Sequence, residues 1–292
     1  MKYSLERYKT RMYYLLLMPA VVLTLVLLLV PLVRGVQISF TNLNMLKGTD
    51  SFVGIKNYIK VFTDVRFYEA LYRTLIYTVL VVLFNFFIGF GMAYICCQKF
   101  VGNKILRTII IMPMLLIPSA GSLLWMYLYN YDLGAFNKIL NLLGIGKVQW
   151  LISQDLVLYS IAITDIWSWT PFMFLLLLAG LEGIDKTPIE AAKIDGASEF
   201  QLMRYVIIPM MGPVISVSVA LKAINVFRTF DYVWIMTKGG PGTSSEILST
   251  YIYKESFKNM TYGYSSAMSI AVMLVSIALS ILLIRKLVLR RD

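Results

Sequence analysis

The chain of 292 residues has only two cysteines, Cys96 and Cys97, and they are adjacent. Because neighbouring side chains on a helix point in different directions, this pair predicts neither a disulfide nor a metal site. The sequence also lacks the phosphate-binding pattern G-x-x-x-x-G-K-[ST], so the chain cannot hydrolyse ATP by that route. We therefore expect it to contain no catalytic residues and no metal ligands.

Charge is scarce as well: charged residues make up 15% of the chain and hydrophobic residues 59%, far from the composition of a soluble domain. A bilayer core about 30 Å thick requires roughly 20 apolar residues per helix. Six runs meet this requirement and leave no connector long enough for a soluble domain: 13–33, 74–97, 108–127, 156–178, 212–236 and 264–284. We predict an all-α membrane domain, 13–284, between tails 1–12 and 285–292.

Basic residues outnumber acidic ones, 27 to 16, for a net charge of +11. Positive charge beside membrane helices marks the cytoplasmic side, which explains this excess better than nucleic-acid binding does. The first run is too long for a signal-peptide core and has no small-x-small cleavage site after it, so we expect a retained signal anchor. Three basic clusters predict that both termini are cytoplasmic: Lys2, Arg7, Lys9 and Arg11; Lys99, Lys104 and Arg107; Arg285, Lys286, Arg290 and Arg291.

Prolines and glycines mark where the runs bend or end. Pro113 and Pro118 lie within the third run and predict a kinked span. The sequence from Lys238 to Gly242, Lys-Gly-Gly-Pro-Gly, is a turn cluster in one of the loops expected on the other side of the membrane. Helical spacing in the first of these loops, 35–73, predicts short helices on the surface.

The loop 182–210 between the fourth and fifth runs predicts two short helices. Thr187 fits an N-cap, Pro188 the first helical position and Glu190 the third residue of a capping box. Gly196 predicts a left-handed end to this helix. A second capping pattern starts at Ser198, so we expect another helix at once, ending near the proline at 209.

The residues alone leave the role of this loop open. It could be an ordinary helical hairpin at the membrane surface. The small pair Ala191 and Ala192 favours close approach by another surface but does not identify it. The loop is also acidic, unlike the other cytoplasmic loops, through Glu182, Asp185, Glu190, Asp195 and Glu199.

The loop resembles the EAA motif of bacterial ATP-binding-cassette importer permeases, at Glu190, Ala191, Ala192, Gly196 and Pro209. Val206 and Ile208 stand where that family shows Ile and Leu. The resemblance to the sugar-permease branch extends along essentially the whole chain, through segments 52–54, 57–58, 178–181, 190–198 and 237–242. One departure is Lys238, where the family more often has Gly.

This resemblance implies the type I importer permease fold: six membrane helices, cytoplasmic termini, and a coupling helix that docks on a separate ATPase. The coupling residues carried over are Glu190, Ala191, Ala192, Asp195, Gly196 and Ala197. The implied partners are two ATPase subunits, which bind ATP and Mg, a second homologous permease that makes a heterodimer, and an extracytoplasmic solute-binding protein. This chain itself would bind no cofactor, and it would lie in the bacterial cytoplasmic membrane.

Polar residues inside the runs predict a hydrated pathway, since a charge at the bilayer centre costs about 2.5–3.5 kcal/mol and avoids lipid. On one helical wheel Ser218, Lys222, Asn225, Thr229 and Tyr232 share an arc, which Arg228 borders; Asp231 could pair with Arg228. In the fourth run Asp165, Trp169 and Phe172 share a face, with the carboxylate and aromatic rings that suit a sugar. The alternative is an Asp165–Lys222 pair that only joins two helices.

Two functions remain in competition. The first is a permease subunit of an ATP-driven importer for a di- or oligosaccharide, or a related polyol or sugar phosphate. The second is a stand-alone carrier coupled to an ion gradient. The lack of any visible internal repeat, inverted or parallel, disfavours the second. The sequence does not identify the solute.

Overall fold

The computed structural model describes residues 2–98 and 100–287. Lys99, Arg290 and Arg291 lie outside the described residues, as do the side chains of the basic residues at 2–11 and of Arg285 and Lys286. Within the described part, strand pairing is limited to two isolated bridges, Thr41 to Phe52 and Asn44 to Thr49. The predicted all-α class is therefore confirmed.

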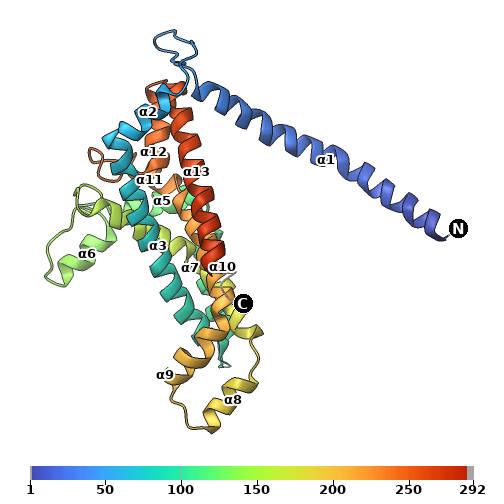
Figure 1. The fold of residues 1–292 in the computed structure, drawn as a ribbon. Coiled ribbons are helices and arrows are strands. Elements are labelled where there is room, and N and C mark those ends of the chain that lie inside the picture. The colour runs from blue at the N-terminus through green and yellow to red at the C-terminus, as the bar shows by residue number, and fades with distance from the viewer. Residues whose placement is uncertain (1, 99, 288–292) are drawn as a thin grey trace. The chain divides into compact units, whose positions relative to one another are not determined.

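Five long helices are separated by short ones along the described chain (Figure 1). The long helices are α1 (Lys2–Ser39), α3 (Val65–Cys97), α7 (Val157–Gly183), α10 (Ile208–Phe227) and α13 (Tyr262–Leu287). The short ones are α2 (Lys56–Thr63), α4 (Asn103–Ile111), α5 (Pro118–Leu128), α6 (Ala135–Leu142), α8 (Thr187–Ile194), α9 (Glu199–Leu202), α11 (Asp231–Thr237) and α12 (Leu248–Tyr253). A 3-10 helix, η1 (Met112–Leu115), and two π-helices, η2 (Met203–Ile207) and η3 (Lys254–Lys258), complete the order.

Each of the six predicted runs lies in a helix or helix pair that could cross a membrane. Five are long and apolar enough on their own: Met12–Ser39, Val65–Cys97, Val157–Gly183, Glu199–Thr237 and Tyr262–Ile281. The sixth is the pair Asn103–Leu115 and Pro118–Leu128, bent by 97°. The predicted kink is thus confirmed and is sharp, because Pro118 forces Ile117 into an extended conformation with ψ of 143°.

The predicted start of the second span, at residue 74, is wrong. Short surface helices were expected in the loop 35–73, but its residues 65–73 belong to the long helix α3, which begins at Val65. No proline or glycine interrupts residues 65–88, so the helix continues once it has started. A short helix is present in the same loop as α2.

The chain divides into two compact units, Met1–Asp64 with Ile252–Val272, and Val65–Tyr251 with Met273–Asp292. In the first unit Asn57 donates to the carbonyls of Ser39 (2.8 Å) and Thr41 (2.7 Å). In the same unit the Tyr264 hydroxyl donates to the Asp64 carboxylate. These bonds fix the loop that follows α1.

The second unit is built on α3, α7 and α10, which run side by side (Figure 1). Two glycines allow close approach: a Cβ on Gly89 of α3 would lie 3.0 Å from Met173 Cγ of α7. A Cβ on Gly180 of α7 would lie 2.7 Å from Met211 Cε of α10. Small residues at such crossings are typical of membrane helices, whose association depends on packing.

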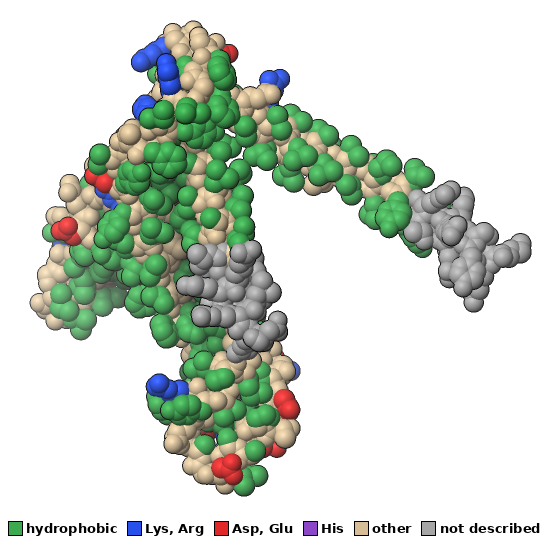
Figure 2. Space-filling model, in the orientation of Figure 1, with side chains coloured by type: hydrophobic (Ala, Val, Ile, Leu, Met, Phe, Trp, Pro, Cys, Tyr) green, Lys and Arg blue, Asp and Glu red, His purple; other side chains and the backbone are tan. Residues whose placement is uncertain are grey.

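Apolar side chains on the outside of this unit suit a hydrocarbon environment. On α3, Leu83, Phe87 and Ile95 are exposed, and Figure 2 shows hydrophobic side chains along this helix. Such a continuous apolar surface is rare on soluble monomers and indicates contact with lipid or with another membrane subunit.

Lys238 adopts the left-handed conformation, with φ of 54°. It ends α11, donating its backbone N–H to the Trp234 carbonyl at 3.1 Å. A non-glycine residue in this conformation costs about 1–2 kcal/mol. Glycine would adopt the same conformation without that cost.

We expect Lys238→Gly to stabilise the protein by about 1 kcal/mol, the relieved strain less part of the entropy that glycine loses on folding. The measurement is the thermal unfolding midpoint of the purified complex in detergent. Lys238→Ala retains the strain and serves as the control, with no gain expected. A lower midpoint for Lys238→Gly than for Lys238→Ala would contradict this explanation.

Candidate functional site

The segment after α7 forms the first candidate site, which we name the α8–α9 hairpin (residues 185–202). Just before its first helix, Asp185 accepts hydrogen bonds from the Thr187 backbone N–H (3.0 Å) and hydroxyl (2.9 Å). These bonds favour the ionised carboxylate and lower the pKa of Asp185. The prediction of Thr187 as N-cap is wrong, because its hydroxyl donates to Asp185 and Lys186 occupies the cap position.

The turn between the two helices is as predicted. Gly196 has φ of +80°, and the Ala197 N–H donates to the Ala192 carbonyl at 2.9 Å, which closes the end of α8. The capping box of α9 is present: Ser198 Oγ accepts from the Gln201 N–H, and Gln201 Oε1 accepts from the Ser198 N–H. The hairpin is therefore a defined structure with satisfied helix ends.

The predicted end of the second helix near Pro209 is wrong. α9 continues through the π-helix η2 into α10, so Pro209 lies in the first turn of α10 and not at a helix end. Pro209 therefore removes one backbone donor where the π-helix passes into α10. The hairpin is thus joined to the fifth span by continuous helix.

The side chains of the hairpin are exposed or half-buried, except that of Leu202, which is buried. Every residue of α8 is exposed or half-buried, and Ile194 is 85% exposed. Glu190, Ala191, Asp195 and Gly196 are exposed, whereas Ala192 and Ala197 are half-buried. In Figure 2 acidic side chains mark this end of the unit. Phe200 of α9 is also 70% exposed, so the hairpin offers apolar residues within an acidic surface.

Apolar and polar contacts attach the hairpin to the rest of the unit. Leu202 is 2% exposed and belongs to an apolar cluster with Ala93 and Cys96 of α3. The Tyr94 hydroxyl of α3 donates to Glu199 Oε2 at 2.8 Å, and within the hairpin Lys193 Nζ lies 3.6 Å from Glu199 Oε1. A cavity of about 560 Å³ lies between these residues and the end of α3. Next to it, Arg107 pairs with Glu182 at 2.7 Å and thereby ties α4 to the end of α7.

The second candidate site lies where α3, α7 and α10 meet, and contains a buried ion pair. Lys222 Nζ lies 3.0 Å from Asp165 Oδ1, and their side chains are 3% and 2% exposed. The Tyr77 hydroxyl donates to the other carboxylate oxygen at 3.0 Å. The Lys222 ammonium also lies 5.2 Å from the centre of the Trp169 ring. The Asp165–Lys222 pair, predicted as the alternative to solute contact, is therefore formed. With Tyr77 it joins α3, α7 and α10.

The fifth span is broken beside this pair. α10 ends at Phe227 and α11 begins at Asp231, so the single helical wheel drawn over residues 218–232 fails beyond Phe227. In the described structure no ion pair joins Arg228 to Asp231, because no continuous helix sets their spacing. Ser218 is buried within α10.

The break nevertheless brings most of the predicted residues to one polar cavity of about 270 Å³. We name it the polar cavity; it is lined by Pro118, Asp165, Trp169, Lys222, Asn225, Arg228, Thr229, Phe230, Asp231 and Tyr232. Phe172 does not line it, but its ring contacts that of Trp169 at 6.1 Å between centres. In the part of the chain described, no group of three or more Cys, Asp or Glu side chains could hold a metal ion.

Sequence reasoning missed Tyr77 and Ser249. Tyr77 is fully buried, and its hydroxyl needed a partner in an apolar span, which was the signal available. Ser249 donates its hydroxyl to the Thr229 carbonyl at the break. Nothing in the local sequence indicates that contact, since the two residues lie in different elements.

Comparison with known proteins now identifies the family. Residues 85–291, which include the hairpin and the polar cavity, match the family described as binding-protein-dependent transport system inner membrane component. The trehalose/maltose transport system permease protein MalF of Thermococcus litoralis is 32% identical over 290 residues, 99% of this chain and 98% of the relative. The sulfoquinovosyl glycerol transport system permease protein SmoG of Agrobacterium fabrum is 32% identical over 272 residues, 93% and 88% of the two chains.

The fold is also shared with a solved structure. A chain of a bacterial ABC transporter involved in the import of the acidic polysaccharide alginate superposes with a TM-score of 0.87. It is 20% identical, and the match covers 100% of both chains, which confirms the predicted importer permease fold. The chain therefore belongs to the family of binding-protein-dependent transport system inner membrane components.

Proposed function

We propose that this chain is the membrane subunit of an ATP-driven importer that carries a sugar, or a related polyol or sugar phosphate, across the cytoplasmic membrane by alternating access. The observation that carries the proposal is similarity along 99% of the chain to a permease named for trehalose and maltose. Relatives named for sulfoquinovosyl glycerol and for sn-glycerol-3-phosphate, the latter 30% identical, support the same solute class.

The α8–α9 hairpin would be the coupling element. Its exposed residues Glu190, Ala191, Asp195 and Gly196, with the half-buried Ala192 and Ala197, would dock in a cleft of a separate ATPase subunit that binds ATP and Mg. Support comes from the rigid capping, the exposed Ile194 and the continuous helix into α10. Movement of the hairpin would then reach the polar cavity directly. In this role the hairpin and, with six spans, both termini would lie in the cytoplasm.

The polar cavity would form part of the solute pathway. Trp169 offers a ring face for the C–H surface of a sugar, and Asn225, Thr229 and Tyr232 offer hydrogen bonds to its hydroxyls. Arg228 is exposed there and supplies a charged donor. Asp165 and Lys222 bind each other, so we assign them to the wall of the pathway, where they hold Trp169 in place.

The assembly would contain two ATPase subunits, a second homologous permease that makes a heterodimer, and an extracytoplasmic solute-binding protein. A structure of the alginate importer in complex with a substrate-bound periplasmic protein supports the last of these; its permease chain is 21% identical to this one. The largely exposed apolar surface of the described helices is consistent with a second membrane subunit.

Reconstitution tests the proposal. Proteoliposomes containing the complete assembly should accumulate a labelled sugar from a panel including trehalose, maltose and sn-glycerol 3-phosphate. Uptake should require internal ATP and the binding protein, and ionophores that collapse proton and sodium gradients should leave it unchanged. Uptake driven by an ion gradient in vesicles that contain this chain alone would contradict the proposal and support a secondary carrier.

A further inference from the structure

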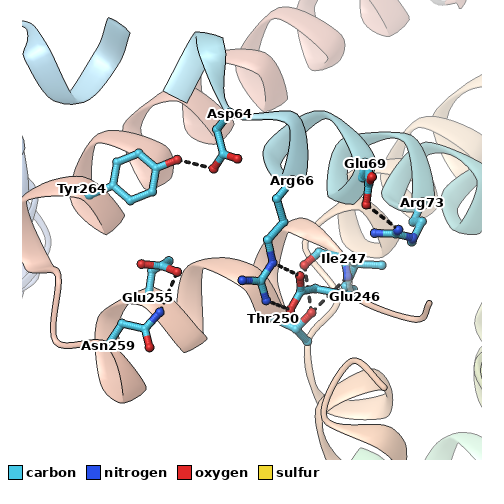
Figure 3. Close-up of polar contacts among 10 residues, drawn as sticks. All are labelled: Asp64, Arg66, Glu69, Arg73, Glu246, Ile247, Thr250, Glu255, Asn259 and Tyr264. Atoms are coloured by element: carbon cyan, nitrogen blue, oxygen red, sulfur yellow. Dashed lines mark hydrogen bonds and ion pairs between the residues drawn. The ribbon is translucent and has the colours of Figure 1, made fainter. Parts of the chain in front are cut away.

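A buried carboxylate outside both candidate sites ties the segment after α11 to α3. Arg66 donates to both oxygens of Glu246, from Nε at 2.7 Å and from Nη2 at 2.9 Å (Figure 3). The Glu246 side chain is 0% exposed, whereas that of Arg66 is 38% exposed. A two-point pair of this kind fixes orientation as well as distance. Neither residue has a part in the coupling hairpin or in the polar cavity.

Further contacts hold the same segment, which we name the anchor segment (residues 245–251). The Leu248 backbone N–H donates to the Thr74 hydroxyl of α3 at 3.0 Å. The Ile247 and Leu248 side chains are each 1% exposed. The Arg66 guanidinium lies 4.7 Å from the centre of the Tyr251 ring. The anchor segment is therefore fixed on α3 by charge, hydrogen bonds and packing together.

The anchor segment also holds the break in the fifth span. The Ser249 hydroxyl donates to the Thr229 carbonyl at 2.5 Å, in the middle of the break between α10 and α11. At the end of α11, the Thr237 and Ser245 hydroxyls lie 2.7 Å apart in a hydrogen bond. Non-helical backbone at membrane depth persists only where its freed carbonyls are satisfied or face water. Ser249 supplies that partner.

We propose that Glu246 and Ser249 are positioning residues of the solute pathway. Arg66 clamps Glu246 on α3, and Ser249 then holds the α10–α11 break in the shape that turns Arg228 and Thr229 toward the polar cavity. The inference rests on the proposed function of that cavity. If it holds, the Arg66–Glu246 contact on α3, which lies outside the polar cavity, sets the geometry of that cavity.

The test measures access to the break in the purified complex. Thr229→Cys is introduced together with Cys96→Ser and Cys97→Ser, and the rate of labelling by a fluorescent maleimide is measured. The anchoring bond uses the backbone carbonyl of residue 229, so the cysteine does not remove it. Adding Ser249→Ala or Glu246→Gln should change the labelling rate by about fivefold or more, since loss of one such bond shifts a local equilibrium by roughly that factor.

Asp132→Asn is the matched control, because it breaks an exposed ion pair, Lys147 Nζ to Asp132 Oδ1 at 3.1 Å, away from the anchor segment. Its labelling rate should equal that of the parent. Ser249→Ala removes only one hydroxyl from a half-buried residue, so we expect it to fold. It therefore tests the inference by itself if Glu246→Gln fails to fold. Parental labelling in folded Ser249→Ala protein would overturn the inference.

Labelling requires neither ATP nor solute, so the two proposals can fail separately. If the parent assembly takes up sugar with ATP, and the Ser249→Ala variant is labelled at the parental rate, only the positioning role is rejected. Absence of ATP-driven uptake by the parent assembly, with altered labelling in Ser249→Ala, rejects the proposed function and leaves the anchoring geometry intact.

Discussion

Replacing Lys222 with Met should destabilise the permease by about 3–5 kcal/mol and abolish most of its transport. The variant would leave the Asp165 carboxylate, 2% exposed, without its cation. Removing one partner of a buried ion pair carries this cost because the remaining charge is neither hydrated nor neutralised. Trp169 would also lose the ammonium 5.2 Å from its ring centre. Denaturant unfolding of the purified complex measures the effect.

The double variant Asp165→Asn with Lys222→Met provides the matched comparison. An Asn side chain can still accept the hydrogen bond from Tyr77, which lies 3.0 Å from the carboxylate. With both charges removed, we expect most of the lost stability to return, since paired replacement is often nearly neutral. If Lys222→Met were as stable as the parent, or if the double variant were worse than either single one, the buried pair would not have the role assigned here.

Gly196→Trp should uncouple ATP hydrolysis from transport while leaving the chain in the membrane. Gly196 is exposed, a Cβ added to it would have no atom within 4 Å, and its φ of +80° is left-handed. A Trp there would project from the surface proposed to dock on the ATPase. We expect uptake per ATP hydrolysed to fall by roughly tenfold or more, the effect of losing about 1.4 kcal/mol from the productive state.

Gly196→Asn is the control for this second prediction. Asn tolerates the left-handed conformation and adds little volume, so coupling should stay near the parental value. The assay compares ATPase rate and sugar uptake in the same proteoliposomes. Parental uptake per ATP in Gly196→Trp would remove the coupling role from the hairpin.

Most features that depend on neighbours in the sequence could be predicted. The six apolar runs, the left-handed Gly196 and the capping box of Ser198 with Gln201 are all present. Each depends on hydropathy, on φ or on residues within one helical turn. The Thr187 cap was wrong because Asp185, two residues earlier, competes for the same hydroxyl.

Features that depend on distant residues could not be predicted. The break at residues 228–230 is held by Ser249, which lies in the anchor segment. Packing between α7 and α10 determines whether Asp165 and Lys222 face the solute or each other. The sequence was compatible with both arrangements. The polar cavity was still found in large part, because its residues share one side of α7 and one stretch of the fifth span.

A photo-reactive amino acid at Ile194, which is 85% exposed on α8, tests the coupling role of the hairpin in the assembled complex. Irradiation should cross-link this position to the ATPase subunit, both without nucleotide and with ATP. Failure to cross-link to any other polypeptide throughout the ATPase cycle, in a complex that still transports, would contradict that role.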